Sequence, residues 1–137
     1  MPHPSAPDPD PAPGIVTIGK AAKKASLGGR TQVIVPVSGD AAALSGQVEA
    51  LASCRADIVE WRADTFLSSL VGAHFVSASD VEEDLARMAR YVADSSPLPI
   101  LATIRTSVEG GEAYLDDEEY CALVRRLASF AGGVDVR

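Results

Sequence analysis

The residues from Gln32 to Arg62 read QVIVPVSGDAAALSGQVEALASCRADIVEWR, and this stretch decides the fold class. Gln32–Val37 is a β-branched run without polar–apolar alternation, which predicts a strand covered on both faces. Asp40–Arg55 predicts an amphipathic helix with Asp40 as its N-cap. The apolar residues at helical spacing in this segment are Leu44, Val48 and Leu51. Asp57–Arg62 predicts a second strand, so the stretch forms a β-α-β unit with parallel strands.

The same alternation continues toward the C-terminus. We expect an irregular loop after Arg62, then a helix over Asp80–Ala93 and a strand over Pro99–Arg105. A Gly-Gly loop, a helix over Asp116–Ala131 and a strand that opens at Gly132–Val136 follow. The inward stripes of the two helices consist of Val81, Leu85, Met88 and Val92, and of Tyr120, Leu123, Val124, Leu127 and Ala131.

Strict alternation of strands and helices predicts an α/β fold built around a parallel sheet. Eight such units form a (β/α)8 barrel of roughly 250 residues, and this chain holds about three and a half of them. A small open α/β sheet is the alternative. We expect the first half of a (β/α)8 TIM barrel, because the chain stops just after its fourth strand begins, with no helix to cover that strand.

The beginning of the chain differs in composition from the rest. Six of the nine prolines lie within Met1–Pro13, a composition that cannot build a core. We expect residues 1–14 to form a disordered Pro-rich tail and residues 15–137 to form the incomplete barrel domain, truncated at the start of its fourth strand. Gly14–Gly19 predicts a short strand, and Lys20–Arg30 has the composition of a linker.

Charge and composition exclude several classes of protein. The chain has 12 Lys and Arg against 19 Asp and Glu, a formal net charge of −7, whereas nucleic-acid binders and proteins of anionic membrane surfaces need a basic face. No apolar run approaches the length of a transmembrane helix, and the N-terminus does not resemble a signal peptide. Cys54 and Cys121 lack metal-ligand spacing, so we expect reduced thiols in a cytoplasmic protein without a metal site.

Polar residues stand at the carboxyl ends of two predicted strands, where parallel sheets bind their ligands. Alternation places Glu60 and Arg62 on one face of the second strand and Trp61 on the other, against the helices. Arg105 ends the third strand, and Glu109 follows it closely. Arginine donates paired hydrogen bonds to carboxylates and hydroxyls, so these four residues predict a binding rim. The alternative is a structural Glu60–Arg62 pair with Arg105 capping its strand.

Three segments at these strand ends resemble type I 3-dehydroquinate dehydratase, a (β/α)8 enzyme of the shikimate pathway. They are Ile34-Val-Pro-Val37, Ile58-Val-Glu-Trp-Arg-Ala-Asp64 and Thr103-Ile-Arg-Thr-Ser-Val-Glu-Gly-Gly-Glu112. The combination of Glu-Trp-Arg-x-Asp with Arg-x-x-x-Glu-Gly-Gly is specific. The short strand at Ile15–Ile18 also resembles the family's N-terminal hairpin, which closes the barrel floor.

The resemblance implies a hydro-lyase that converts 3-dehydroquinate to 3-dehydroshikimate in aromatic amino acid biosynthesis, with no metal and no external cofactor. A lysine forms a Schiff base with the substrate ketone, and a histidine moves the proton. By position in the motifs, Glu60 and Arg62 are implied to hold substrate hydroxyls and Arg105 to grip the substrate near its reacting end. Glu109 is implied to orient the catalytic histidine.

The sequence departs from this family in the residues that carry out the chemistry. No lysine follows Lys24 and no histidine follows His74, so the Schiff-base lysine and the catalytic histidine are not in this chain. Pro36 stands where many members carry a small hydroxyl residue. We give His74 no role as a base, because it has no partner in the sequence. We therefore expect the chain to be inactive alone and, through an unpaired sheet edge, to be able to form a homodimer.

Two other functions remain open at this point. The chain can be a genuine short protein that kept the rim and acts as a ligand-binding or regulatory module, which predicts a stop codon after Arg137 and binding without turnover. It can also belong to a different (β/α)8 lyase or isomerase, which predicts a lysine that dehydroquinate and borohydride do not trap.

Overall fold

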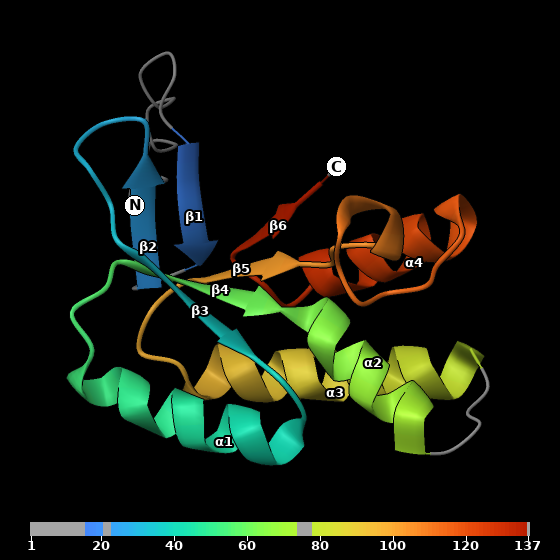
Figure 1. The fold of residues 1–137 in the computed structure, drawn as a ribbon. Coiled ribbons are helices and arrows are strands. Elements are labelled where there is room, and N and C mark those ends of the chain that lie inside the picture. The colour runs from blue at the N-terminus through green and yellow to red at the C-terminus, as the bar shows by residue number, and fades with distance from the viewer. Residues whose placement is uncertain (1–15, 21–22, 74–77, 137) are drawn as a thin grey trace, which may run out of the picture.

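Four parallel strands form the central sheet of the computed structural model, which describes residues 16–20, 23–73 and 78–136. The strands follow chain order across the sheet (Figure 1). They are β3 (Ile34–Ser38), β4 (Ile58–Arg62), β5 (Ile100–Thr103) and β6 (Gly133–Asp135). Each lies within its predicted segment or one residue beyond it, so the expected α/β fold with a parallel sheet is confirmed.

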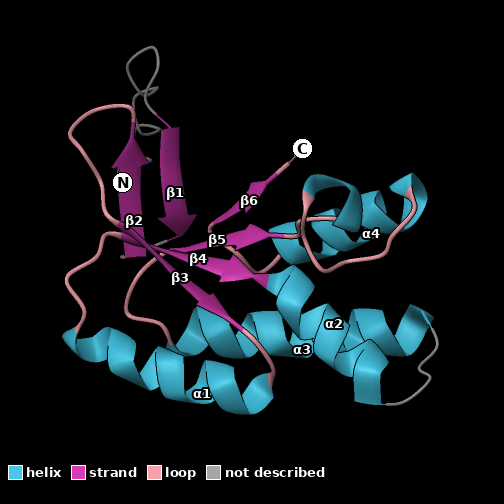
Figure 2. Ribbon diagram, viewed as in Figure 1, coloured by secondary structure: helices cyan, strands magenta, loops and turns pink. Residues whose placement is uncertain are grey.

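Helices that join successive strands pack side by side against one face of the sheet, with α1 and α3 below the strands in Figure 2 and α4 beside α3. They are α1 (Ala41–Ala50), which continues into a 3₁₀ turn at Leu51–Ser53, α3 (Ala78–Ser95) and α4 (Asp117–Ala128). The carboxylate of Asp40 accepts from the backbone N–H of Ala43 at 2.9 Å, which confirms it as the N-cap of α1. The carboxylate of Asp116 caps α4 in the same way, through the N–H of Glu119 at 2.7 Å.

A helix that the sequence did not predict follows β4 directly. This is α2 (Ala63–Ala73), where we expected an irregular loop. Phe66 and Leu67 are buried, and the helix contacts β3, β5 and α3, so tertiary packing stabilises a segment whose serines and glycine indicated a loop. Ala63, its first residue, continues from the last residue of β4 with no intervening turn to mark the change. His74 lies outside the described residues.

The segment after the first predicted strand is a second strand and not a linker. β1 (Val16–Lys20) pairs antiparallel with β2 (Lys23–Leu27), so the expected hairpin is present and the linker expected over Lys20–Arg30 is wrong. The backbone N–H of Gly19 donates to the carbonyl of Gly132 at 3.2 Å, which ties the hairpin to the sheet opposite α1 and α3 (Figure 1). A Cβ at Gly132 would come within 2.7 Å of the Cα of Gly19, so this close approach requires glycine.

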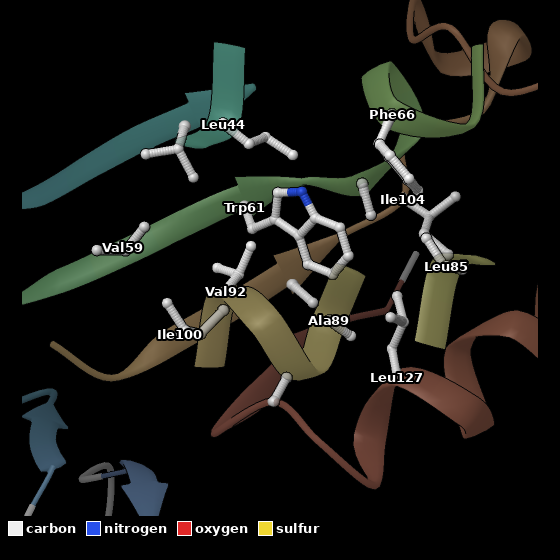
Figure 3. Packing of buried hydrophobic residues seen from close by; sticks show 14 of the residues in the cluster. Leu44, Val59, Trp61, Phe66, Leu85, Ala89, Val92, Ile100, Ile104 and Leu127 are labelled. Carbon is white, nitrogen blue, oxygen red and sulfur yellow. The ribbon is translucent and has the colours of Figure 1, made fainter. Parts of the chain in front are cut away.

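The core lies between the sheet and the helices and is centred on Trp61 (Figure 3). Val59 and Trp61 of β4 are buried in it, which confirms that Trp61 packs on the helix side of the sheet. The other members named in Figure 3 include Leu44, Phe66, Leu85, Ala89, Val92, Ile100, Ile104 and Leu127. Burial of this indole and its neighbours supplies the main apolar stabilisation of the fold.

Strand β3 is not covered on both faces as its apolar run predicted. Ile34 is 44% exposed and Pro36 is also exposed, whereas Val37 is buried against the helices. β3 is an edge strand of the sheet, and Pro36 is tolerated there because an edge strand does not use every N–H in a ladder. An apolar run therefore indicated a strand correctly but not its two-sided burial.

Candidate functional site

Arg62, the last residue of β4, is held by a carboxylate two residues further along the chain. Its Nε donates to Oδ1 of Asp64 at 2.9 Å, and its Nη2 donates to Oδ2 at 2.7 Å. Asp64 lies in the first turn of α2 and is 0% exposed, so α2 places this carboxylate under the guanidinium. The paired hydrogen bonds favour the charged form of Arg62 and raise its pKa above the ordinary arginine value.

The same carboxylate also binds the loop after β5. The backbone N–H of Glu112 donates to Oδ2 of Asp64 at 3.1 Å, and the Arg105 backbone also favours the ionised form of this carboxyl and lowers its pKa. Burial works to raise the pKa of Asp64, but the bonds from Arg62, Glu112 and Arg105 outweigh it and hold that pKa below the ordinary value. Asp64 is therefore ionised at neutral pH. We expected no role for it, although it closes the Glu-Trp-Arg-x-Asp motif.

Glu60 lies two residues before Arg62, on the same face of β4, and has a partner on the next strand. Its Oε2 accepts from Oγ1 of Thr103 at 3.0 Å, and Thr103 is fully buried at the end of β5. The strand register sets Thr103 beside Arg62, so the two strand ends share these polar contacts. The alternative of a Glu60–Arg62 pair is wrong, because the hydrogen-bond partner of Arg62 is Asp64 and that of Glu60 is Thr103.

Arg105 opens a tight loop that ends at Ala113. The N–H of Ser107 donates to the carbonyl of Ala113 at 2.8 Å, and the N–H of Gly111 donates to the carbonyl of Thr106, also at 2.8 Å. Gly111 packs directly on the Arg105 backbone, where a Cβ would overlap the Arg105 carbonyl. The guanidinium of Arg105 is half-buried, and its Nε has no hydrogen-bond partner among the described residues.

Glu109 lies apart from the other three predicted residues. It ends the 3₁₀ turn Ser107–Glu109 and is exposed. Within the described part of the chain, its side chain makes no hydrogen bond or ion pair with Glu60, Arg62 or Arg105. The structure therefore joins Arg62 to the backbone of Glu112 through Asp64, keeps Glu60 on the same face of β4, and holds Glu109 on the exposed side of the loop after β5.

Other candidate sites are weaker. A hollow of about 650 Å³ lies at the amino ends of the strands, lined among others by Lys23, Lys24, Arg30 and Asp57. Ligands of parallel α/β sheets bind at the carboxyl ends, so this hollow is at the wrong end of the sheet. Among the residues that the structure describes, no cluster of three or more His, Cys, Asp or Glu side chains could hold a metal ion. No helix of the described residues is long and apolar enough to cross a membrane.

A family model described as type I 3-dehydroquinase matches residues 33–136, which include both strand ends of the rim. The chain belongs to the type I 3-dehydroquinase family. A 3-dehydroquinate dehydratase of Klebsiella pneumoniae (strain 342) is 36% identical over 109 residues, which are 79% of this chain and 39% of that protein. A Bacillus velezensis protein of the same name is 35% identical over 99 residues, or 71% of this chain and 35% of the relative. The resemblance drawn from the motifs is thus confirmed.

Solved structures of this type I 3-dehydroquinase family agree with the fold. A Geobacillus kaustophilus 3-dehydroquinate dehydratase superposes with a TM-score of 0.66 at 25% identity, covering 90% of this chain and 45% of that one. A type I 3-dehydroquinate dehydratase of Clostridium difficile, solved with covalently modified comenic acid, gives a TM-score of 0.60 at 26% identity and covers 88% and 42%. The chain spans less than half the length of the relatives it matches.

Proposed function

We propose that this chain supplies the substrate-holding part of an active site that dehydrates 3-dehydroquinate to 3-dehydroshikimate. The observation that carries the proposal is the rim itself, in which Glu60 and the paired Arg62 lie on one face of β4 at its carboxyl end, in a chain belonging to this family. A polyhydroxylated acid offers hydroxyls to both. Glu60 accepts from a hydroxyl, and Arg62 donates to one through the N–H groups that Asp64 leaves unused.

We also propose that the chain is the first half of a (β/α)8 barrel. Two features support this: the four parallel strands follow chain order, and the solved relatives it superposes on are more than twice as long. An open half-barrel leaves the inner face of the sheet and two edge strands without cover. The exposed Ile34 on β3 supports association of such edges, including formation of a homodimer.

The chemistry divides between this chain and residues beyond it. In this proposal Arg105 grips the substrate near its reacting carbon, and Glu109 orients the histidine that removes the proton. The lysine that forms the Schiff base, which acidifies the neighbouring C–H, comes from a later strand. The described lysines lie in the hairpin at the other end of the sheet. The exposed free thiols Cys54 and Cys121 are compatible with the reducing cytoplasm, where we place the protein.

A chimeric enzyme tests this function. The 137-residue chain is fused ahead of the part of the Klebsiella relative that lies beyond the matched residues, and turnover is followed by the ultraviolet absorbance of the conjugated enone product. We expect the chimera to dehydrate 3-dehydroquinate. In the presence of dehydroquinate, borohydride should reduce the Schiff base and link the ligand covalently to the chimera. The chain alone should do neither. Arg62→Ala in the chimera lowers kcat/KM by about 100-fold, because a charge-assisted contact to the substrate is lost.

A control variant and two opposing outcomes complete the design. Asp57→Asn, at the other end of β4, leaves turnover unchanged because it lies away from the rim. Turnover by the unfused chain contradicts the division of the site. A folded chimera that binds dehydroquinate without turning it over contradicts the enzymatic function and favours a binding module.

A further inference from the structure

Asp64 is the buried ionised group of the rim, and the proposed reaction assigns it no contact with substrate. Its carboxylate accepts three hydrogen bonds, two from the guanidinium of Arg62 and one from the N–H of Glu112. A buried carboxylate is costly to desolvate unless it is fully paired. Here both oxygens are paired, and they are paired to two different segments of the chain.

The bonds of Arg62 leave it prepared for a ligand. A guanidinium has five N–H donors in one plane, and Asp64 occupies only Nε and one hydrogen of Nη2. The Arg62 side chain is 21% exposed, whereas Asp64 is fully buried. The carboxylate therefore holds one edge of the guanidinium, while Nη1 and the second hydrogen of Nη2 stay free for a ligand on the partly exposed side chain.

The bonds to the loop act on a different part of the rim. Glu112 and Arg105 bracket the turn that carries Glu109; the Glu112 N–H binds Asp64, and the carbonyl of Arg105 accepts from the N–H of Ala113, which closes the loop. Because Asp64 lies in the first turn of α2, two residues after the end of β4, one side chain sets the position of the β5 loop relative to Arg62.

We propose that Asp64 is a positioning residue that orients Arg62 toward the ligand and couples it to the Arg105–Glu112 loop. The identity of that ligand rests on the proposed function, but the coupling does not. Loss of the Asp64 charge frees the guanidinium to rotate and releases the loop at the same time. A side chain with a purely structural role would change the free energy of unfolding without making the orientation of Arg62 and the position of the loop depend on each other.

Nuclear magnetic resonance of the 137-residue chain measures the coupling without any ligand. In the wild type we expect a slowly exchanging Arg62 Nε–H signal, because this group donates to a buried carboxylate. Asp64→Asn should abolish it and shift the backbone N–H signals of both Arg105 and Glu112. Asp57→Asn is the matched control, since Asp57 also pairs with an arginine and accepts a backbone N–H, and it should leave all three signals unchanged.

A second variant tests the same coupling by removing the guanidinium and leaving the carboxylate in place. Arg62→Gln should shift the Glu112 N–H, which is hydrogen-bonded to Asp64 and not to Arg62, through its effect on Asp64, while Arg30→Gln should not. Folded Asp64→Asn and Arg62→Gln variants whose loop signals match the wild type overturn the proposal. It is also overturned if both rim variants fail to fold while both controls fold, because Asp64 would then be structural only.

A titration with 3-dehydroquinate separates this inference from the proposed function. We expect the ligand to shift the Arg62 Nε–H signal in the wild type, and Asp64→Asn to raise Kd by about tenfold because the arginine is no longer pre-oriented. If 3-dehydroquinate shifts nothing in the wild type but the coupling is present, the proposed ligand is wrong and the positioning role stands. If Asp64→Asn binds the ligand as tightly as the wild type, the positioning role fails.

Discussion

The two ends of strand β4 carry the same kind of contact in different surroundings. Asp57 precedes the strand, pairs with Arg30 at 3.0 Å and accepts the backbone N–H of Val33 at 2.8 Å. Asp64 follows it, pairs with Arg62 at 2.7 Å and accepts the N–H of Glu112 at 3.1 Å. Each carboxylate thus joins an arginine to the backbone of a neighbouring segment.

Exposure is what differs between them. The side chains of Arg30 and Asp57 are 73% and 25% exposed, against 21% and 0% for Arg62 and Asp64. Water screens the first pair, and such exposed pairs contribute little to stability. The second pair is shielded, so removing one partner leaves a charge without compensation. The same chemistry therefore ties down a segment at the amino end and sets the geometry of a site at the carboxyl end.

Among the variants that test this difference, Asp64→Ala should cause the largest loss of stability. We expect the free energy of unfolding of the chain to fall by about 3 kcal/mol, since the variant leaves Arg62 unpaired and the loop N–H of Glu112 without an acceptor. Urea unfolding followed by circular dichroism measures it, with Asp57→Ala as the matched control. Equal destabilisation by the two variants would contradict the conclusion that the buried pair stabilises the fold more than the exposed pair.

Gly111→Ala examines the loop that Asp64 holds. An added Cβ would overlap the Arg105 carbonyl, so the loop must move away, at a cost of about 1–3 kcal/mol. The thermal midpoint and the Glu112 N–H signal should both shift. Gly29→Ala is the control, because nothing lies within 4 Å of the Cβ position there. A Gly111→Ala chain that melts like the wild type would show that the loop is not held in place.

Lowering the pH should remove the contribution of Asp64 to the stability of the fold. The folded-state pKa of Asp64 is lowered, so its contribution to stability is fully present above the unfolded aspartate pKa of about 3.9 and is lost as the pH falls through the lower folded value. Urea midpoints between pH 7 and pH 2 measure this loss. Asp64→Asn should flatten the decline below pH 4. A decline of unchanged steepness in that variant would assign the acid sensitivity to other carboxylates.

Asp57→Asn should have the smallest effect. The backbone N–H of Val33 and the Arg30 guanidinium lower the pKa of Asp57, but both contacts are open to water. We expect an unfolding midpoint close to the wild type, with the remaining difference disappearing in high salt. A large loss of stability that persists in high salt would contradict the comparison, because the Arg30–Asp57 pair would then contribute to stability as a buried pair does.

Local patterns predicted most of the fold. The four strands of the parallel sheet, the helices α1, α3 and α4 and the Asp40 cap follow from periodicity and capping, which depend on residues close in sequence. The same patterns did not predict α2 or β2. The helical state of α2 depends on Phe66 and Leu67 packing against distant strands and α3, and β2 depends on pairing with β1.

The sequence by itself determined the order of the elements, the family and which side of β4 carries Glu60 and Arg62, because alternation along a strand is a property of the backbone. Only the tertiary structure decided the partners of those residues. Thr103 lies 43 residues from Glu60, and the parallel pairing of β4 with β5 brings them together; Glu112 lies 48 residues from Asp64, and the loop after β5 brings its N–H to that carboxylate. Burial then decided the role of each carboxylate, because the surroundings of Asp57 and Asp64 come from segments distant in the chain.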